Sequence, residues 1–217
     1  MDPKELIARR VALDIKPGSL VNLGIGLPSL VASFVSPEMG VFFQAENGVI
    51  GLGARPPEGM EDPNLTDAGG GFVTAVPGAA SIDSAMSFGL IRGGHLDMTV
   101  LGGLQVDEAG HLANWKVPGK MVPGMGGAMD LVTGAKKVIV AMQHSARGET
   151  KIIKECTLPL TSLRRIDLVV TDLCVIEPSD EGLVLRELAP GVSADQVVAS
   201  TGARLILPDT IPEMRLS

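Results

Sequence analysis

Short apolar runs alternate with amphipathic segments and glycine-rich turns along most of the chain. The first segment predicts a helix. Asp2 is a suitable N-cap, Pro3 suits the first turn, and Glu5 completes the spacing of a capping box. An apolar stripe follows at helical spacing, and Pro17-Gly18 is expected to end the helix.

The other elements are predicted from β-branched runs, helical periodicity and the glycines and prolines that bound them. Strands are expected at residues 20–23, 41–45, 98–101, 137–142, 168–171, 183–188 (as an edge strand) and 205–207. Helices are expected at residues 29–34, 81–91 and 193–200, and residues 51–71 are expected to form an irregular loop.

Short strands that alternate with helices, several of them ended by glycine turns, are typical of an α/β sheet covered on both faces. We therefore expect an open, mostly parallel sheet with helices on both faces. The chain has no internal repeat, low-complexity tract or linker, so residues 1–217 are expected to form one domain.

Composition narrows the range of partners. The chain has no Tyr, one Trp and five Phe, so base stacking is not expected to be its mode of binding. Its net charge of −7 argues against nonspecific binding to nucleic acid or to an anionic membrane. The two cysteines are too far apart for a CxxC motif, and the charged start lacks the apolar run of a signal peptide, which favours the cytoplasm.

Ligands of open α/β sheets bind beyond the carboxyl ends of the strands. Glu46 follows a predicted strand on a sharp turn made by Asn47 and Gly48. A carboxylate is already ionised at neutral pH, so Glu46 could act as a nucleophile without an activating base. From residue type alone, a solvated turn residue is the alternative. The other groups that follow predicted strands are Gly24-Ile25-Gly26, Gly102-Gly103 and Gln143-His144.

A glycine loop at residues 124–130 is the natural electrostatic partner for such a carboxylate. Gly126 and Gly127 precede a predicted helix, so their N–H groups could point at a negative oxygen, although a plain helix-entry turn has the same spacing. Lys116 and Lys120 flank the loop as candidate receivers of an anionic substrate, or as a solvated pair. Three methionines at four-residue spacing are expected to line a core or pocket: Met121, Met125 and Met129.

A dinucleotide site is a second interpretation of the same residues. Gly24-x-Gly26 lies between a predicted strand and a helix, and Glu46 follows at the spacing of a ribose-binding acid. However, Ser29 replaces the third glycine and Pro28 occupies the turn, so the fingerprint is incomplete. The three histidines lack metal-ligand spacing, so no metal site is predicted: His95, His111 and His144.

Six co-linear segments resemble the B (β) subunit of the two-subunit class I CoA-transferases, in particular the 3-oxoacid (acetate/acetoacetate) type. The resemblance runs from Ile7 to about Val175. The usual catalytic turn of that family is Ser-Glu-Asn-Gly, and here Ala45 replaces the serine while Glu46 is kept. The matching segments are residues 21–28, 44–48, 91–95, 101–107, 112–115 and 122–131.

The resemblance implies a CoA-transferase-like fold and ping-pong transfer of CoA between a short-chain acyl-CoA (acetoacetyl-CoA, succinyl-CoA or acetyl-CoA) and a carboxylic acid. It implies that Glu46 carries CoA as a glutamyl thioester and that Gly127, with Gly126, supplies oxyanion N–H groups. Asn47, Gly24 and Gly26 complete the predicted substrate-binding set.

Coenzyme A is then both substrate and covalent intermediate, with no metal or redox cofactor. The resemblance also implies a separate A (α) subunit, in a heterotetramer or another hetero-oligomer. Residues 51–71 are the candidate cover of the site. Three alternatives stay open: a nicotinamide-dependent dehydrogenase, a noncatalytic ligand-binding subunit, and an isomerase acting on a phosphorylated sugar.

Overall fold

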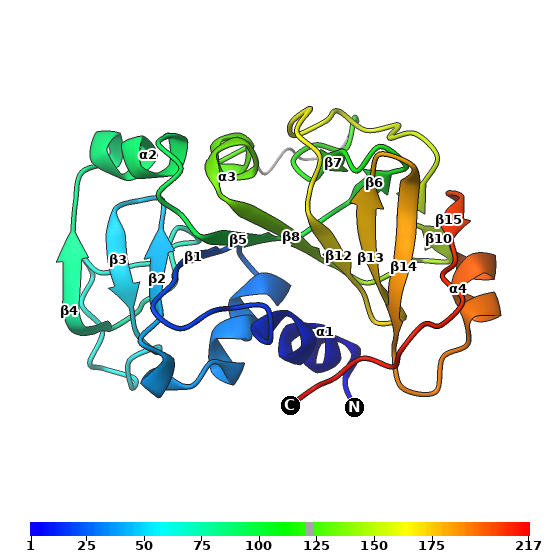
Figure 1. Cartoon of the computed structure of the whole chain (residues 1–217). Coiled ribbons are helices and arrows are strands. Elements are labelled where there is room, and N and C mark those ends of the chain that lie inside the picture. The colour runs from blue at the N-terminus through cyan, green and yellow to red at the C-terminus, as the bar shows by residue number, and fades with distance from the viewer. Residues whose placement is uncertain (120–123) are drawn as a thin grey trace.

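The computed structural model describes residues 1–119 and 124–217. Their main feature is an open sheet with strand order β15-β14-β13-β12-β8-β5-β1-β2-β3-β4 (Figure 1). The central strands β12, β8, β5, β1 and β2 are parallel, as predicted, whereas β13 and β3–β4 join antiparallel. The strands are β1 (Leu20–Leu23), β2 (Phe42–Ala45), β3 (Val49–Leu52), β4 (Ala75–Ser81), β5 (Met98–Leu101), β8 (Lys137–Ala141), β12 (Leu168–Val170), β13 (Cys174–Ser179), β14 (Gly182–Leu188) and β15 (Leu205–Ile206).

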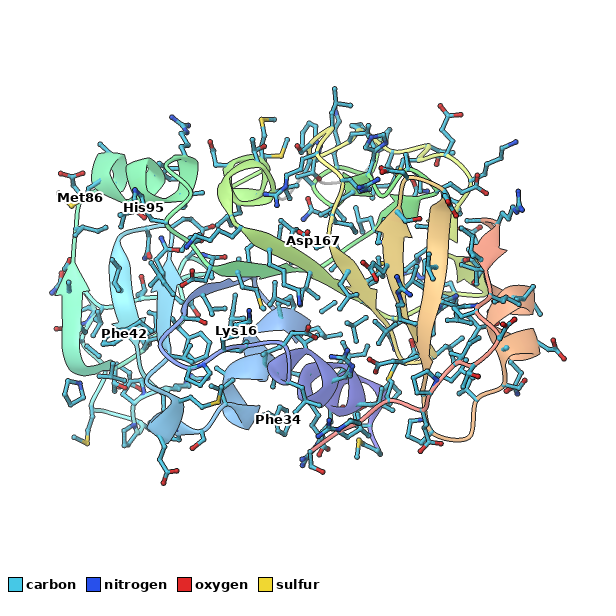
Figure 2. The ribbon with its side chains drawn as sticks, viewed as in Figure 1. Lys16, Phe34, Phe42, Met86, His95 and Asp167 are labelled. Atoms are coloured by element: carbon cyan, nitrogen blue, oxygen red, sulfur yellow. The ribbon has the colours of Figure 1, made fainter. Side chains whose placement is uncertain are left out.

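Helices cover both faces of this sheet, as expected. In Figure 1, α1 (Pro3–Ala12) lies on one face, and α2 (Ser84–Arg92) and α3 (Ala128–Gly134) lie on the other. Figure 2 shows Phe34 on the α1 side, with Met86 and His95 on the α2 side. The remaining elements are η1 (Leu27–Phe34), η2 (Pro37–Met39), β6 (Gln105–Asp107), β7 (Leu112–Ala113), β9 (Ser145–Ala146), β10 (Glu149–Thr150), β11 (Ile152–Ile153) and α4 (Ala194–Ser200).

Two apolar cores lie on the two faces because successive strand residues point to opposite sides. Along β8, Val138 and Val140 pack into the core beneath α2 and α3, whereas Ile139 packs into the core with α1. All three are fully buried, and each contributes roughly 1.5–3 kcal/mol relative to an exposed side chain. Packing on both faces holds the sheet rigid and so fixes the positions of the carboxyl ends of the parallel strands. Within the described residues, no helix is long and apolar enough to cross a lipid bilayer.

The first helix differs from its prediction at both ends. Asp2 has an extended conformation and its side chain caps no N–H group, so the predicted capping box does not form. The helix ends at Ala12, short of Pro17-Gly18. Asp14 and Ile15 instead donate to carbonyls three residues earlier, and Ile15 turns into the core. By contrast, a capping box does form at the start of the 193–200 helix, between Ser193 and Gln196.

Four further elements differ from their predictions. The predicted edge strand 183–188 lies inside the sheet, because the unpredicted strand β13 pairs on one side of β14 and β15 pairs on the other. The predicted helix 81–91 begins at Ser84, because Ser81 ends β4 and the Asp83 carboxylate accepts a hydrogen bond from Met86 N. Residues 29–34 belong to a 3-10 helix, not an α-helix, and β3 extends into the predicted loop.

β4 forms one edge of the sheet. Its residues are small and largely exposed on both faces. Pro77, in the middle of the strand, has no N–H group to donate to a neighbouring strand.

Candidate active site

Glu46 lies directly after β2, at the carboxyl end of the parallel strands, as predicted. The Gly48 N–H donates to the Ala45 carbonyl and closes the turn. Gly48 has a φ of +119°, and a Cβ there would lie 2.1 Å from the carbonyl oxygen of Ile82, so this position requires glycine. Ala45 is buried and contributes only a methyl group where the family pattern has serine.

The Gly126–Gly127 turn packs against the Glu46 side chain. A Cβ added at Gly127 would lie 3.1 Å from Glu46 Cγ and 3.3 Å from Oε1, so any larger residue would have to displace the Glu46 side chain. Gly126 adopts a φ of +53° in the same turn. In the part of the chain that the structure describes, the N–H groups of both glycines find no hydrogen-bond acceptor. Backbone N–H groups of this kind can donate to a negative oxygen that lies beside them.

Close packing of α2 and α3 holds this turn in place. A Cβ at Gly134 would lie 2.1 Å from the carbonyl oxygen of Ile91, so glycine allows the two helices to touch through their backbones. Arg92 and Asp130 form an ion pair of 2.7 Å between the same helices. The Asp130 hydrogen bond and charge raise the pKa of the Arg92 guanidinium.

Asn22 was not predicted as a site residue, yet it touches the candidate nucleophile. Its Nδ2 lies 3.3 Å from Glu46 Oε2, and its side chain is fully buried. The one feature of the sequence that could have identified Asn22 is that it is a polar residue within the otherwise apolar strand Leu20–Leu23. The parallel register, which pairs Asn22 with Gln44 of β2, brings it beneath Glu46.

The other predicted site residues surround the same turn. Gly24 donates its N–H to the Val100 carbonyl, and a Cβ there would lie 3.1 Å from that oxygen. Gly26 has a φ of +84° and begins the 3-10 helix. The Asn47 amide donates to the Thr66 carbonyl at 2.8 Å, so Asn47 ties down the 51–71 loop. A Cβ at Gly69 of this loop would lie 3.2 Å from Ile25 Cγ1, so the loop reaches the turn at residues 24–26.

His144 is a buried structural residue. Its ring nitrogens lie 3.1 Å and 3.0 Å from the hydroxyls of Thr171 and Thr201. Burial lowers the pKa of His144, and the negative charge of Asp172 only partly opposes this. Both ring nitrogens are occupied within the protein, so nothing directs this histidine toward Glu46.

The remaining candidates are dispersed. Lys116 Nζ lies 5.7 Å from the centre of the Trp115 ring, and the His111 ring contacts Asp107 at 3.2 Å. Met125 is half-buried and Met129 is exposed. Lys120 and Met121 lie outside the described residues. Among those described, no group of three or more His, Cys, Asp or Glu side chains could hold a metal ion.

The turn at residues 24–26 does not supply the expected dinucleotide geometry. It leads into a 3-10 helix with Pro28 in its first turn, whereas a pyrophosphate site uses the N–H groups at the start of an α-helix.

The chain is similar to known proteins along its whole length. A model of the family described as "Coenzyme A transferase" matches residues 4–200. The beta subunit of acetate CoA-transferase from Haemophilus influenzae is 52% identical over 218 residues, covering 100% of this chain and 97% of that protein. The B subunit of succinyl-CoA:3-ketoacid coenzyme A transferase from Helicobacter pylori is 53% identical over 201 residues, covering 92% of this chain and 97% of that protein.

Solved structures share the fold. The acyl-CoA transferase YdiF of Escherichia coli O157:H7, crystallised as an apoenzyme, superposes with a TM-score of 0.80 at 24% identity. The alignment covers 99% of this chain but only 44% of that one, so the chain corresponds in length to less than half of YdiF. At this identity the match concerns the fold alone.

Proposed function

The chain belongs to the coenzyme A transferase family and is a CoA-transferase component, and we propose that it transfers CoA from an acyl-CoA to a carboxylic acid through a thioester on Glu46. The observation that carries this proposal is the packing of the Glu46 side chain against the Gly126–Gly127 turn. A carboxylate and the backbone of a glycine turn thereby meet at one place, which supports the pairing of a nucleophile with N–H donors that acyl transfer requires.

The first half-reaction begins when an oxygen of Glu46 attacks the thioester carbonyl carbon of the acyl-CoA. The resulting oxyanion accepts hydrogen bonds from the N–H groups of Gly126 and Gly127. The C–S bond breaks, and the CoA thiolate leaves a mixed anhydride. The thiolate then attacks Cδ of Glu46, and the Cδ–O bond to the acyl group breaks. The first carboxylate departs, and Glu46 holds CoA as a thioester.

The second half-reaction runs in reverse with an acceptor carboxylate. No electron is transferred and the thioester energy is conserved, so the chemistry calls for CoA as substrate and covalent intermediate, without a metal or redox cofactor. Hydrolysis of the glutamyl thioester would waste each cycle, and exclusion of water therefore favours turnover. The 51–71 loop is held next to the site through Asn47 and Ile25, which supports its role as the cover.

The relatives' names point to a partner. Both of the relatives described above are named as one subunit of their enzyme, the beta or B subunit, and we propose that this chain acts as one domain beside an A subunit in a hetero-oligomer. Ile25, adjacent to the site, is 73% exposed, and Met129 beyond the glycine turn is 48% exposed. An A subunit seated over these side chains would cover them and enclose Glu46. We assign the complex to the cytoplasm and its substrates to short-chain acyl-CoAs such as acetoacetyl-CoA, succinyl-CoA or acetyl-CoA.

A trapping experiment tests the proposal. The chain co-purified with its A subunit is mixed with acetoacetyl-CoA, treated with hydroxylamine and digested for peptide mass mapping. We expect a hydroxamate on Glu46 that disappears when acetate or acetoacetate is added before trapping. The Glu46→Gln complex should show no modification and no transfer, whereas Glu38→Gln, at an exposed glutamate, should behave as the unaltered complex.

Transfer activity retained by Glu46→Gln would contradict the proposal and favour a noncatalytic subunit. An unmodified Glu46 in a complex that NAD protects against heat would favour the dehydrogenase instead.

A further inference from the structure

Resting on the proposed function, we infer that Asn22 holds one oxygen of Glu46 in place and directs the other toward the substrate. Thr99 and Gln44 fix the direction of the Asn22 amide. Asn22 touches a reacting atom, so the structure assigns it a catalytic role, whereas Thr99 and Gln44 are positioning residues.

The two oxygens of the Glu46 carboxylate have different surroundings. Asn22 Nδ2 lies 3.3 Å from Oε2, on the sheet side. Oε1 faces the glycine turn, 3.3 Å from where a Cβ at Gly127 would be. Oε1 is therefore the carboxylate oxygen nearer the glycine turn, and it is the one that attacks the thioester.

The direction of the Asn22 amide follows from its neighbours. Nδ2 lies 3.0 Å from both the main-chain oxygen and Oε1 of Gln44, and it faces Glu46 as well. Thr99 Oγ1 donates to Asn22 Oδ1 at 3.4 Å on the opposite side. Turning the amide over would place its carbonyl oxygen against three acceptors, so only one orientation satisfies the hydrogen bonds.

Gln44 is itself fixed from α2. Its Nε2 donates to Ser87 Oγ at 2.9 Å, which leaves its Oε1 to accept from Asn22. Asn22, Gln44, Ser87 and Thr99 are all at most 1% exposed. A row of buried polar groups is costly unless every member is paired, and no buried side-chain nitrogen or oxygen of the described residues lacks a partner. The row therefore presents an N–H donor to Glu46.

This donor matters most in the second step of the half-reaction. When the CoA thiolate attacks Cδ of Glu46, a C–S bond forms and negative charge develops on Oε2. The C=O bond then re-forms at Oε2 as the Cδ–Oε1 bond breaks. Oε1 leaves as part of the released carboxylate, which carries the negative charge. Asn22 Nδ2 already lies at Oε2, so its N–H bond strengthens as that charge grows and no group needs to reorganise.

Single-turnover kinetics test this role in the complex with the A subunit, using acetoacetyl-CoA and following thioester formation on Glu46. Asn22→Asp keeps the shape but replaces the donor with a second carboxylate, and we expect the maximal rate to fall about 100-fold or more. Thr99→Val removes only the hydroxyl that fixes the amide, and we expect a fall of about 10-fold. The half-saturating acetoacetyl-CoA concentration should change by less than about threefold, because the acyl-CoA does not bind through these groups.

Thr171→Val is the matched control. Thr171 is another fully buried threonine at the end of a parallel strand, and its hydroxyl contacts His144 and Cys174, not Glu46. We expect this variant to melt at a lower temperature but to form the thioester at the unaltered rate. It separates loss of a buried hydrogen bond from loss of catalysis.

The outcomes are distinct. If Thr99→Val and a folded Asn22→Asp both form the thioester at the unaltered maximal rate, the role of Asn22 is refuted while the proposed function stands. If Asn22→Asp does not fold, an unaltered rate in Thr99→Val alone refutes it. An unaltered complex that transfers CoA without any thioester on Glu46 refutes the proposed function first, and the role of Asn22 with it.

Discussion

Gly127 and Glu46 touch so closely that a Cβ on the glycine would lie 3.1 Å from Cγ of the glutamate. The two residues come from distant segments, the end of β2 and the start of α3. The contact holds the nucleophile with backbone on one side and the Asn22 amide on the other. The carboxylate therefore has little freedom to turn away from a bound thioester.

Gly127→Ala is expected to slow thioester formation on Glu46 about 10- to 100-fold, because the new methyl displaces the carboxylate by a few tenths of an ångström. Gly127 has a φ of −83°, which alanine adopts freely, so the variant should fold. Stopped-flow trapping with acetoacetyl-CoA measures the rate, and circular dichroism checks the fold.

The same substitution at Gly89 is the control for Gly127→Ala. A Cβ at Gly89, inside α2, meets no atom within 4 Å. Gly89→Ala should therefore leave the rate unaltered and stabilise the helix by about 0.5–1 kcal/mol. Equal rates in Gly127→Ala and Gly89→Ala would show that the approach of Gly127 to Glu46 is unimportant.

Stability is expected to decline on mild acidification because of His144. Burial lowers the pKa of this residue below its ordinary value, so below a pH of about 6.5 the unfolded chain binds a proton that the folded chain rejects. Above that pH, His144 makes its full contribution to the free energy of unfolding. This contribution is lost below that pH, by at most about 1.4 kcal/mol per pH unit, until the pKa of the folded state is reached.

Urea unfolding at a pH of about 7.5 and about 5.5 measures this loss, with His144→Gln as the comparison. The variant lacks the titrating ring, so its free energy of unfolding should change less between the two pH values. An identical change in the free energy of unfolding in both proteins would show that His144 is not the cause of the loss.

The two cysteines are expected to resist alkylation in the folded protein. The pKa of the Cys174 thiol is raised to about 12, mainly by burial; a hydrogen bond with Thr171 acts against this rise and the negative charge of Asp172 adds to it. Burial and the neighbouring Asp107 likewise raise the pKa of Cys156 to about 12. At a pH of about 8, iodoacetamide should react about a thousandfold more slowly than with an ordinary exposed cysteine. Mass spectrometry before and after unfolding in guanidinium measures the difference, and rapid labelling of the folded chain would disprove it.

Arg147→Asn is expected to stabilise the protein by about 0.5–1 kcal/mol. Arg147 and Gly148 connect β9 to β10 as a two-residue turn, and both have positive φ, +53° and +82°. Arginine is strained in this region, whereas asparagine is well suited to it. Arg147→Ala keeps the strain and should give no gain. Thermal unfolding compares the three proteins, and equal gains from both substitutions would contradict the explanation.

Local pattern was sufficient to predict the position of Glu46 on a turn after a strand, although it left open whether this residue is a nucleophile or a solvated turn residue. The strand before it is a short apolar run, and Asn47-Gly48 signals a turn, so both could be seen within a few residues. The residues alone suggested the glycine loop as a partner of Glu46 but left a plain helix-entry turn open, because the approach of Gly127 depends on the packing of α2 on α3. The family resemblance supplied that relationship.

Asn22 escaped prediction for a related reason. One polar residue in an apolar strand has several ordinary explanations. Its role emerges only when the parallel register places it between Gln44 on β2 and Thr99 on β5. These neighbours are far from Asn22 in the sequence and are brought to it only by the pairing of strands in the sheet.

β13 was not predicted from the sequence, and its Pro178 is a residue that argues against a central strand. The structure accommodates this proline because the β12 ladder pairs only Val175 and Ile176, so Pro178 lies beyond it. The Asp2 cap failed for a different reason. A suitable residue type supplies a cap only if its side chain turns back onto the helix, and that of Asp2 does not.

The proline in β4 has a consequence for how the protein behaves at high concentration. An exposed strand of unpaired N–H and C=O groups is a template on which other chains can polymerise. In β4, Pro77 removes one donor from the middle of that template, and Gly78 beside it has a φ of +88°, far from a strand conformation. An incoming strand therefore meets an interrupted ladder, and aggregation along this edge is opposed by the backbone itself.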